Sequence, residues 1–157
     1  MNFMKDHFWQ KGGSWVLIQW ILMTATLVAG PLGRGDWEGG ASPWAAMGFL
    51  VLGSVFGIAG AIQLGRYRTI FPEPKAGSPL VQDGIFGMVR HPLYTSVISL
   101  SLAWALGWRS GLALLPALAT VVFLDAKARC EEARLRKRFT EYDDYAHRVK
   151  RLIPFLY

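Results

Sequence analysis

The chain alternates between long apolar runs and shorter polar segments. Four runs cover residues 15–32, 45–64, 92–108 and 111–126, and they contain almost no charged residues. A helix of about 20 apolar residues is long enough to cross the hydrocarbon core of a bilayer. The last two runs are near the short end for a full span, and the two-residue turn between them predicts a helical hairpin. The pattern therefore predicts an all-α integral membrane protein with about four transmembrane helices.

Two of these runs carry further information. The first follows a basic start, which is also typical of a secretory signal peptide, but it is long for that role and contains tryptophan, which favours a membrane helix. In the second run Gly53, Gly57 and Ala61 recur at four-residue spacing, which allows close packing of helices in lipid. The alternative is that glycine is simply common in membrane helices.

Composition agrees with a membrane protein. The chain is 52% hydrophobic and only 18% charged, and it forms a single predicted domain over residues 1–157. Its net charge of +6 could suggest nucleic acid, but nine of the 17 Lys and Arg residues fall within 127–151, where five acids are mixed with them. The charge is therefore a topology signal, and we expect no nucleic-acid partner. The lone Cys130 excludes an internal disulfide.

Lysine and arginine placement predicts the orientation. The two termini and the loop between the second and third runs are basic, whereas the other two loops carry only Arg34 and Arg109. By the positive-inside rule, both termini and the long loop lie in the cytoplasm.

The C-terminal part predicts two helices. The fourth run continues out of the bilayer as a helix that ends near Phe139. Thr140 and Asp143 fit a capping pair for a second, surface-lying amphipathic helix that ends at Pro154. The apolar stripe of that second helix comprises Tyr142, Tyr145, Val149 and Leu152.

The long loop at residues 65–91 ends in the most informative stretch of the chain, Arg90-His91-Pro92. The loop is too apolar for disorder and is expected to fold back onto the protein or the membrane surface. Proline suits the first position of a helix, so a helix is predicted to begin at Pro92 with its positive end beside Arg90 and His91. Such an end is a ready site for an anion. Taken alone, His91 is more typically a capping or packing residue.

Glu131 and Glu132 form the second candidate group. Both border the inward stripe of their helix, where a carboxylate needs a cationic partner. The alternative is an ordinary surface pair held by neighbouring arginines. The hairpin is expected to bring this pair back beside Arg90. A pocket with a cation and a helix start on one wall and carboxylates on the other suits S-adenosylmethionine, which has a carboxylate, an ammonium group, ribose hydroxyls and a sulfonium.

No metal site is expected, because His7, His91 and His147 lack the spacing of metal ligands.

Two motifs then resemble a known family. Residues 80–94 read Leu-Val-x-x-Gly-Ile-Phe-x-x-Val-Arg-His-Pro-x-Tyr, and residues 131–154 contain Glu-Glu-x-x-Leu-x-x-x-Phe, Glu-Tyr-x-x-Tyr, Arg-Val and Ile-Pro in that order. Together they resemble the membrane methyltransferases that include isoprenylcysteine carboxyl methyltransferase and phosphatidylethanolamine N-methyltransferase. The likeness covers about residues 80–155. Phe86 stands where a tyrosine is usual, and Thr140 where a glycine is usual.

The resemblance implies an S-adenosylmethionine-dependent enzyme with its active site at the cytoplasmic side of the membrane. The cofactor-binding residues it implies are Leu80, Val81, Gly84, Arg90, His91, Pro92, Tyr94, Glu131, Glu132, Tyr142 and Tyr145. The residues it implies for catalysis are His91, Glu131, Glu132 and Arg148.

The expected reaction is transfer of the sulfonium methyl group to a lipid or lipidated acceptor. A phospholipid amine is favoured and an isoprenylcysteine-type carboxylate comes next. An amine needs a base, for which Glu131, Glu132 or His91 are candidates, whereas a carboxylate needs a cation such as Arg148. Two alternatives stay open: a membrane reductase that uses NADPH, since sterol reductases resemble this family in their C-terminal pocket, and a non-enzymatic membrane protein with a lipid-binding basic tail.

Overall fold

The computed structural model of the protein describes residues 12–38, 42–67 and 77–157. In these ranges the fold is all-helical and contains no strand, which confirms the predicted fold class at that level. The α-helices are α2 (Gly13–Leu32), α3 (Ser42–Leu64), α4 (Pro92–Trp108), α5 (Gly111–Arg138) and α6 (Tyr142–Arg148). Two short 3-10 helices, η1 (Gly65–Tyr67) and η2 (Gly84–Gly87), lie between α3 and α4.

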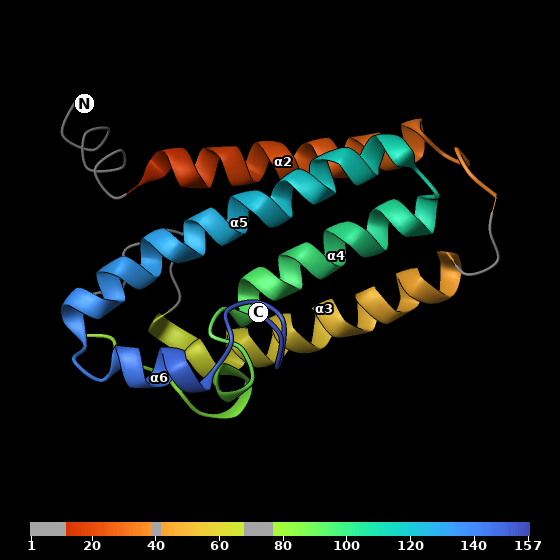
Figure 1. The fold of residues 1–157 in the computed structure, drawn as a ribbon. Helices are drawn as coiled ribbons and strands as arrows, with labels where there is room; N and C mark the ends of the chain where they lie inside the picture. Colours follow the sequence, from red (N-terminus) through yellow and green to blue (C-terminus); the bar gives the residue numbers. More distant parts are fainter. Residues whose placement is uncertain (1–11, 39–41, 68–76) are drawn as a thin grey trace.

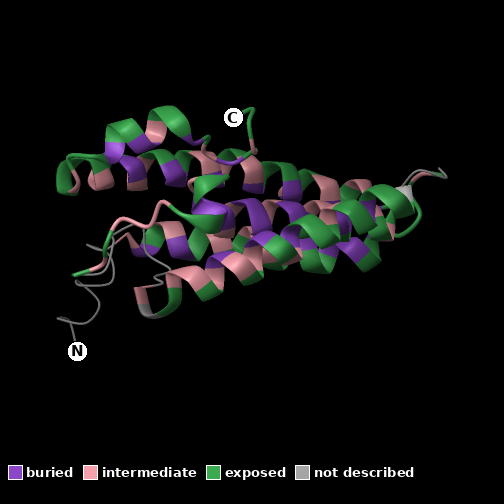
Figure 2. Ribbon diagram, turned by 90° about the horizontal axis from the view of Figure 1, so that it is seen from below, coloured by how far each residue is buried: buried purple, intermediate pink, exposed green. Residues whose placement is uncertain are grey.

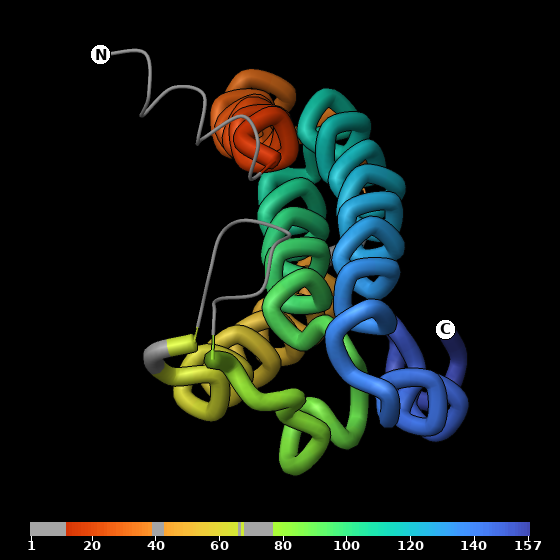
Figure 3. The backbone as a smooth tube through the Cα atoms, turned by 90° about the vertical axis from the view of Figure 1, so that its left-hand side faces the viewer, coloured from red at the N-terminus to blue at the C-terminus, as the bar shows by residue number. Residues whose placement is uncertain are grey.

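The four long helices lie side by side along one axis, and the short helix α6 folds back under the far end of α5 (Figure 1). Helix α4 packs against α2, α3 and α5 and is therefore the centre of the bundle. Figure 3 shows α2 and α3 on opposite sides of α4. The buried side of α4 is lined by small residues, mainly serine and alanine, which let its neighbours approach closely.

Three of the described helices are long and apolar enough to cross a membrane: α2, α3 from Pro43, and α5. Helix α4 has 17 residues, about 25 Å at 1.5 Å per residue, which is just short of a typical bilayer core. Large apolar side chains such as Trp44, Ile62 and Val122 are exposed on the outside of the bundle (Figure 2). This outward-facing apolar surface is the arrangement that a lipid environment requires.

Close glycine contacts join α3 to α4. A Cβ added at Gly53 would lie 2.8 Å from Leu100 Cγ, and one at Gly57 would lie 2.5 Å from Ser96 Oγ. The small side chains also allow the Ser96 hydroxyl to donate to the Gly53 carbonyl oxygen at 2.6 Å. The predicted packing role is confirmed for both glycines. The next close approach is made by Gly60 against Pro92.

The α4–α5 hairpin is closed by Arg109 and Ser110. Arg109 adopts the left-handed conformation with φ 53°, and Ser110 caps α5 by accepting from Ala113 N–H at 3.1 Å. The same hydroxyl donates to the Ala29 carbonyl oxygen at 2.9 Å and so ties the turn to α2. This turn brings the end of α5 back to the start of α4, as the sequence predicts.

The prediction for the tail needs correction. Helix α6 ends at Arg148 rather than Pro154, and no side chain caps its start at Glu141. The chain after α6 instead pairs with the segment before α4: Arg90 N–H donates to the Lys150 carbonyl oxygen at 2.8 Å, and His91 N–H to that of Arg151 at 3.1 Å. These backbone hydrogen bonds compete with continuation of the helix. The apolar stripe of α6 is buried against α5, not turned toward lipid.

Candidate functional site

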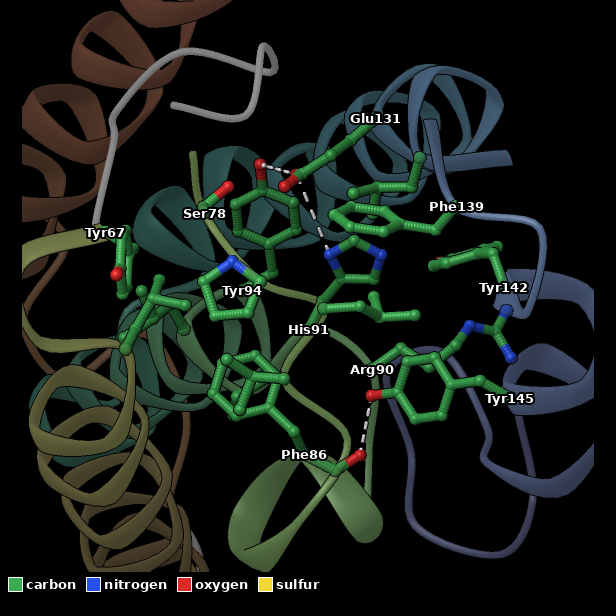
Figure 4. Close-up of a pocket in the computed structure, with 17 residues that line it drawn as sticks. Tyr67, Ser78, Phe86, Arg90, His91, Tyr94, Glu131, Phe139, Tyr142 and Tyr145 are labelled. Carbon is green, nitrogen blue, oxygen red and sulfur yellow. Dashed lines mark hydrogen bonds and ion pairs between the residues drawn. The ribbon is translucent and has the colours of Figure 1, made fainter. Parts of the chain in front are cut away.

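A pocket opens where the start of α4 meets the last turns of α5 and the helix α6 (Figure 4). Together with the open solvent at its mouth, the pocket spans about 820 Å³ of empty space. The lining residues that the sequence singles out are Leu80, Val81, Arg90, His91, Pro92, Tyr94, Glu131, Tyr142 and Tyr145.

The α4 end of the pocket forms as predicted. His91 precedes the helix with φ −125° and ψ 64°, and Pro92 takes the first helical position. The carbonyl oxygen of His91 accepts from Tyr94 N–H and Thr95 N–H, each at 3.0 Å. The imidazole and the Tyr94 ring stack with their centroids 5.2 Å apart. The local backbone therefore places two planar, polar side chains side by side in the pocket wall.

Glu131 faces this pair from α5. Tyr94 Oη donates to Glu131 Oε2 at 2.8 Å, and His91 Nδ1 lies 3.8 Å from the same oxygen. The Glu131 side chain keeps 21% of its surface exposed and lines the pocket. Its carboxylate can therefore receive a cationic or hydroxyl group of a ligand.

Glu132 lies behind the wall, in different surroundings. Its side chain is completely buried and does not line the pocket. Its Oε1 accepts from Arg90 Nε at 3.0 Å and Nη2 at 2.8 Å and from Arg151 Nε at 3.0 Å, and His91 Nε2 lies 3.3 Å away. A buried carboxylate between two guanidinium groups fixes the elements that carry them.

All three nitrogens of the Arg90 guanidinium donate hydrogen bonds. Besides the contacts with Glu132, its Nη1 donates to the carbonyl oxygens of Ala146 and Val149 at the end of α6. Arg151 joins the same cluster: burial by itself lowers the pKa of Arg151, but its hydrogen bonds to Glu132 and Asp125 hold that pKa above the usual range. Both arginines therefore brace the pocket.

Aromatic side chains form the other wall. Tyr145 Oη donates to the Phe86 carbonyl oxygen at 2.7 Å, and the Tyr142 and Tyr145 rings meet edge to face with centroids 5.8 Å apart. Burial raises the pKa of both phenols, which keeps them neutral. The buried hydroxyl of Tyr142 has no hydrogen-bond partner within the described residues. A buried polar atom without a partner in a pocket wall points to a ligand that supplies one.

Gly84 and Arg148 do not line the pocket. Gly84 has φ +55°, and a Cβ there would lie 2.6 Å from Gln63 Oε1, so glycine is needed where the loop meets α3. Gln63 holds that loop by donating to the Asp83 carbonyl oxygen at 2.6 Å. Arg148 is exposed and donates to Gln82 Oε1 at 3.2 Å. Both residues support the segment that carries Leu80 and Val81.

Several contributors were missed by the sequence analysis. Arg151 could not be told from the other cations of the basic tail, and Gln63 looked like the polar end of an apolar run. Leu64 and Tyr67, which line the pocket from the end of α3, carry no motif that would single them out. Their position follows only from the packing of α3 on α4.

Within the described ranges, no group of His, Cys, Asp and Glu side chains is arranged to hold a metal ion. His7 lies outside the described residues, and His147 is exposed on α6 with its Nδ1 2.7 Å from the Asp143 carbonyl oxygen.

Comparison with known proteins adds to this geometry. The model of the phospholipid methyltransferase family matches residues 41–142, which include most of the pocket wall. The chain is 27% identical to the nickel-cobalt-cadmium resistance protein NccN of Alcaligenes xylosoxydans xylosoxydans over 87% of the chain and 62% of that protein. It is 37% identical to a Delta(14)-sterol reductase of Mus musculus over 52% of the chain and 20% of that protein.

The chain thus spans less than two thirds of the length of either relative. The family match, by contrast, covers well over half of the chain, from the start of α3 to the first residue of α6. It confirms the resemblance noted in the sequence. The pocket between α4, α5 and α6 is therefore the candidate functional site, and the chain belongs to the phospholipid methyltransferase family.

Proposed function

We propose that the protein transfers a methyl group from S-adenosylmethionine to a lipid-borne acceptor, with the pocket at the start of α4 as the active site. The observation that carries the proposal is the pairing of Glu131 with Tyr94 and His91 in a pocket whose opposite wall is aromatic. The family match over residues 41–142 supports it.

The residues present fit this cofactor. The aromatic and aliphatic wall suits a flat adenine ring, and Glu131 suits the ammonium or a ribose hydroxyl. The unpartnered Tyr142 hydroxyl suits a further polar atom of the ligand. The positive end of α4 suits the carboxylate. Leu80, Val81 and Pro92 would complete the binding surface.

In this proposal Arg90 and Glu132 position the wall rather than touch the cofactor, because each is already engaged by the other and by neighbouring groups. Gly84 and Arg148 would act in the same indirect way through the loop. Direct contact is assigned to the pocket-lining residues other than Arg90, above all His91, Tyr94 and Glu131.

S-adenosylmethionine supplies an already activated methyl group, so the protein mainly has to align donor and acceptor and exclude water. If the acceptor is a phospholipid amine, which we favour, His91 or Glu131 would remove its proton. An isoprenylcysteine-type carboxylate, the next candidate, needs no base. We expect the acceptor to enter from the bilayer between Leu64 of α3 and Leu93 of α4, which both line the pocket.

We further propose that α4 is a fourth span and that the pocket lies on the cytoplasmic side. Helix α4 is held on three sides by the three longer helices, which allows a short helix to remain at membrane depth. The basic residues flanking the pocket end support the orientation.

The direct test is a transfer assay. The protein, reconstituted with a total lipid extract, is supplied with S-adenosylmethionine that carries a labelled methyl group. We expect label in the lipid fraction with the intact protein and a strong loss with Glu131→Gln. Label that appears only on water-soluble compounds, or on nothing, would overturn the proposal.

A reductase that uses NADPH is the second candidate, since the match to the sterol reductase favours it. The two are separated by ligand binding in detergent. Saturable binding of S-adenosylhomocysteine supports the methyltransferase, and saturable binding of NADPH supports the reductase. Binding of neither would favour a non-enzymatic role.

A further inference from the structure

The last five residues, 153–157, which we call the C-terminal turn, present apolar side chains to the outside. Phe155 and Leu156 are 82% and 78% exposed, and Ile153 and Tyr157 are each about half exposed. No other described helix or loop covers them. Such a concentration of exposed large apolar groups on a short loop points to an interaction surface.

The turn is an ordered, hydrogen-bonded structure. The Tyr157 carbonyl oxygen accepts from Leu152 N–H and Ile153 N–H, each at 2.8 Å, and Tyr157 N–H donates back to the Ile153 carbonyl oxygen at 3.1 Å. Phe155 adopts φ 65°, which is rare for a residue with a side chain. These hydrogen bonds satisfy much of the local backbone, a requirement for any loop that contacts lipid.

Side-chain contacts fix the turn to α5. Arg129 Nη2 donates to Tyr157 Oη at 2.7 Å, and Tyr157 Oη lies 3.2 Å from Asp125 Oδ1. In Figure 1 the C-terminal segment runs back along the bundle from α6, and Figure 2 shows its exposed end beside α5. Along the axis of α5, the C-terminal turn therefore lies at the height of Asp125 and Arg129.

That level corresponds to the edge of a bilayer. Asp125 and Arg129 lie about 21 and 27 Å along α5 from Gly111 at 1.5 Å per residue, and a hydrocarbon core is about 30 Å thick. The opposite edge is marked by a polar contact, Gly111 N–H to Asp36 Oδ2 at 2.8 Å. The C-terminal turn is thus placed where acyl chains give way to headgroups.

Cations outnumber anions beside the turn. Asp125 pairs with both Arg129 and Arg151, and the side chains of Arg129 and Lys150 are exposed. Exposed cations beside an apolar tip match an interface in which phosphates lie above acyl chains.

We propose that the C-terminal turn is an anchor that inserts Phe155 and Leu156 into the membrane interface beside α5. The anchor replaces the surface-lying helix expected from the sequence, since the apolar stripe of α6 is buried in the protein. Arg151 connects the anchor to the pocket, because it lies just before the turn and contacts both Asp125 and Glu132. The anchor would hold the pocket end of the bundle against the bilayer.

The test uses a polarity-sensitive nitrobenzoxadiazole label on single cysteines, in a Cys130→Ser background. Phe155→Cys and Leu156→Cys are compared with Asp144→Cys, an exposed position on α6. The proteins are placed in vesicles of equal parts phosphatidylcholine and phosphatidylglycerol. Two test positions keep the proposal testable if one variant fails to fold, and the readout does not depend on methyl transfer.

At 155 and 156 we expect blue-shifted emission, quenching by lipids that carry a nitroxide high on the acyl chain, and about fivefold weaker quenching by iodide than at 144. Iodide quenching as strong as at 144 would overturn the proposal, because the turn would then lie in water. Protection from both iodide and nitroxide lipids would also overturn it, because another protein surface would then cover the turn.

Discussion

Glu131 and Glu132 are adjacent in the sequence, but they belong to two different regions of the molecule. Glu131 lies in the open wall of the pocket, where its carboxylate contacts Tyr94 and remains partly exposed. Glu132, the next residue of α5, is fully buried in a cluster with Arg90 and Arg151. One region can exchange its partners for a ligand, whereas the other holds the surrounding segments in place. Within one motif, therefore, Glu131 is suited to bind a ligand and Glu132 to position the surrounding segments.

The largest effect is expected in this buried cluster. Glu132→Gln leaves the buried Arg90 guanidinium without its counter-charge and removes one of the two carboxylates that pair with Arg151, which should cost about 3–5 kcal/mol of folding free energy. The melting temperature in detergent measures it. Arg136→Gln is the matched control, because its contact with Glu132 is longer, at 3.7 Å, and more exposed. A Glu132→Gln protein as stable as the wild type would contradict the assigned role.

In the open wall of the pocket, replacing the glutamate by glutamine should affect ligand binding rather than folding stability. Glu131→Gln removes a charged acceptor, which should weaken binding of S-adenosylhomocysteine by about 10- to 100-fold, equivalent to about 1.5–3 kcal/mol. The melting temperature of the ligand-free protein should change less than for Glu132→Gln, since Glu131 is partly exposed and the buried Lys127 near it also donates to Gln19 Oε1 at 2.7 Å. Equilibrium dialysis with labelled ligand gives the dissociation constant. Equal losses of stability in Glu131→Gln and Glu132→Gln would remove the distinction between the two regions.

Tyr142→Phe tests whether the aromatic wall, like Glu131, contributes to ligand binding rather than to folding stability. The change removes a buried hydroxyl that has no partner in the described structure, so stability near neutral pH should stay equal or rise. Ligand affinity should fall severalfold, about 0.5–1.5 kcal/mol, if the hydroxyl pairs with the bound cofactor. Unchanged affinity would show that the hydroxyl has no ligand partner.

The same residue predicts a pH dependence. Burial raises the pKa of Tyr142 in the folded protein above its ordinary value of 10.0, so the unfolded chain releases this proton first. The stability that the neutral phenol contributes is complete below pH 10 and is lost as the pH rises above it. Melting temperatures between pH 8 and 11 should therefore fall more steeply for the wild type than for Tyr142→Phe. Parallel curves would contradict the shift.

The smallest effect is expected outside both regions. Arg148 is exposed and contacts Gln82 in the loop that carries Leu80 and Val81. Arg148→Ala should change cofactor affinity by less than about threefold, because exposed polar contacts contribute little. A loss as large as that of Glu131→Gln would place Arg148 in the binding surface itself.

The apolar runs were sufficient to predict the all-helical fold, Pro92 the start of α4, and the short hairpin turn the return of Glu131 and Glu132 toward Arg90. Each of these depends on local patterns or on a short hairpin. The sequence could not separate the two glutamates, because both border the same helical stripe, and only the tertiary positions of Arg90 and Arg151 decide that Glu132 is the enclosed one.

The predicted end of α6 at Pro154 was wrong for a related reason. Val149 and Leu152 continue an apolar helical pattern, but the backbone there pairs with Arg90 and His91, distant residues whose competing hydrogen bonds leave no local signal. The role of Arg151 was hidden in the same way.

The central claim is that the methyl donor binds in the pocket between α4, α5 and α6. Ultraviolet crosslinking of S-adenosylmethionine labelled in its methyl group, followed by peptide mapping, tests it most directly. The account predicts label on peptides that contain Tyr94, Phe139 or Tyr142, and loss of that label with excess S-adenosylhomocysteine. Label confined to peptides from α2 or the first half of α3, or labelling that the competitor does not reduce, would contradict it.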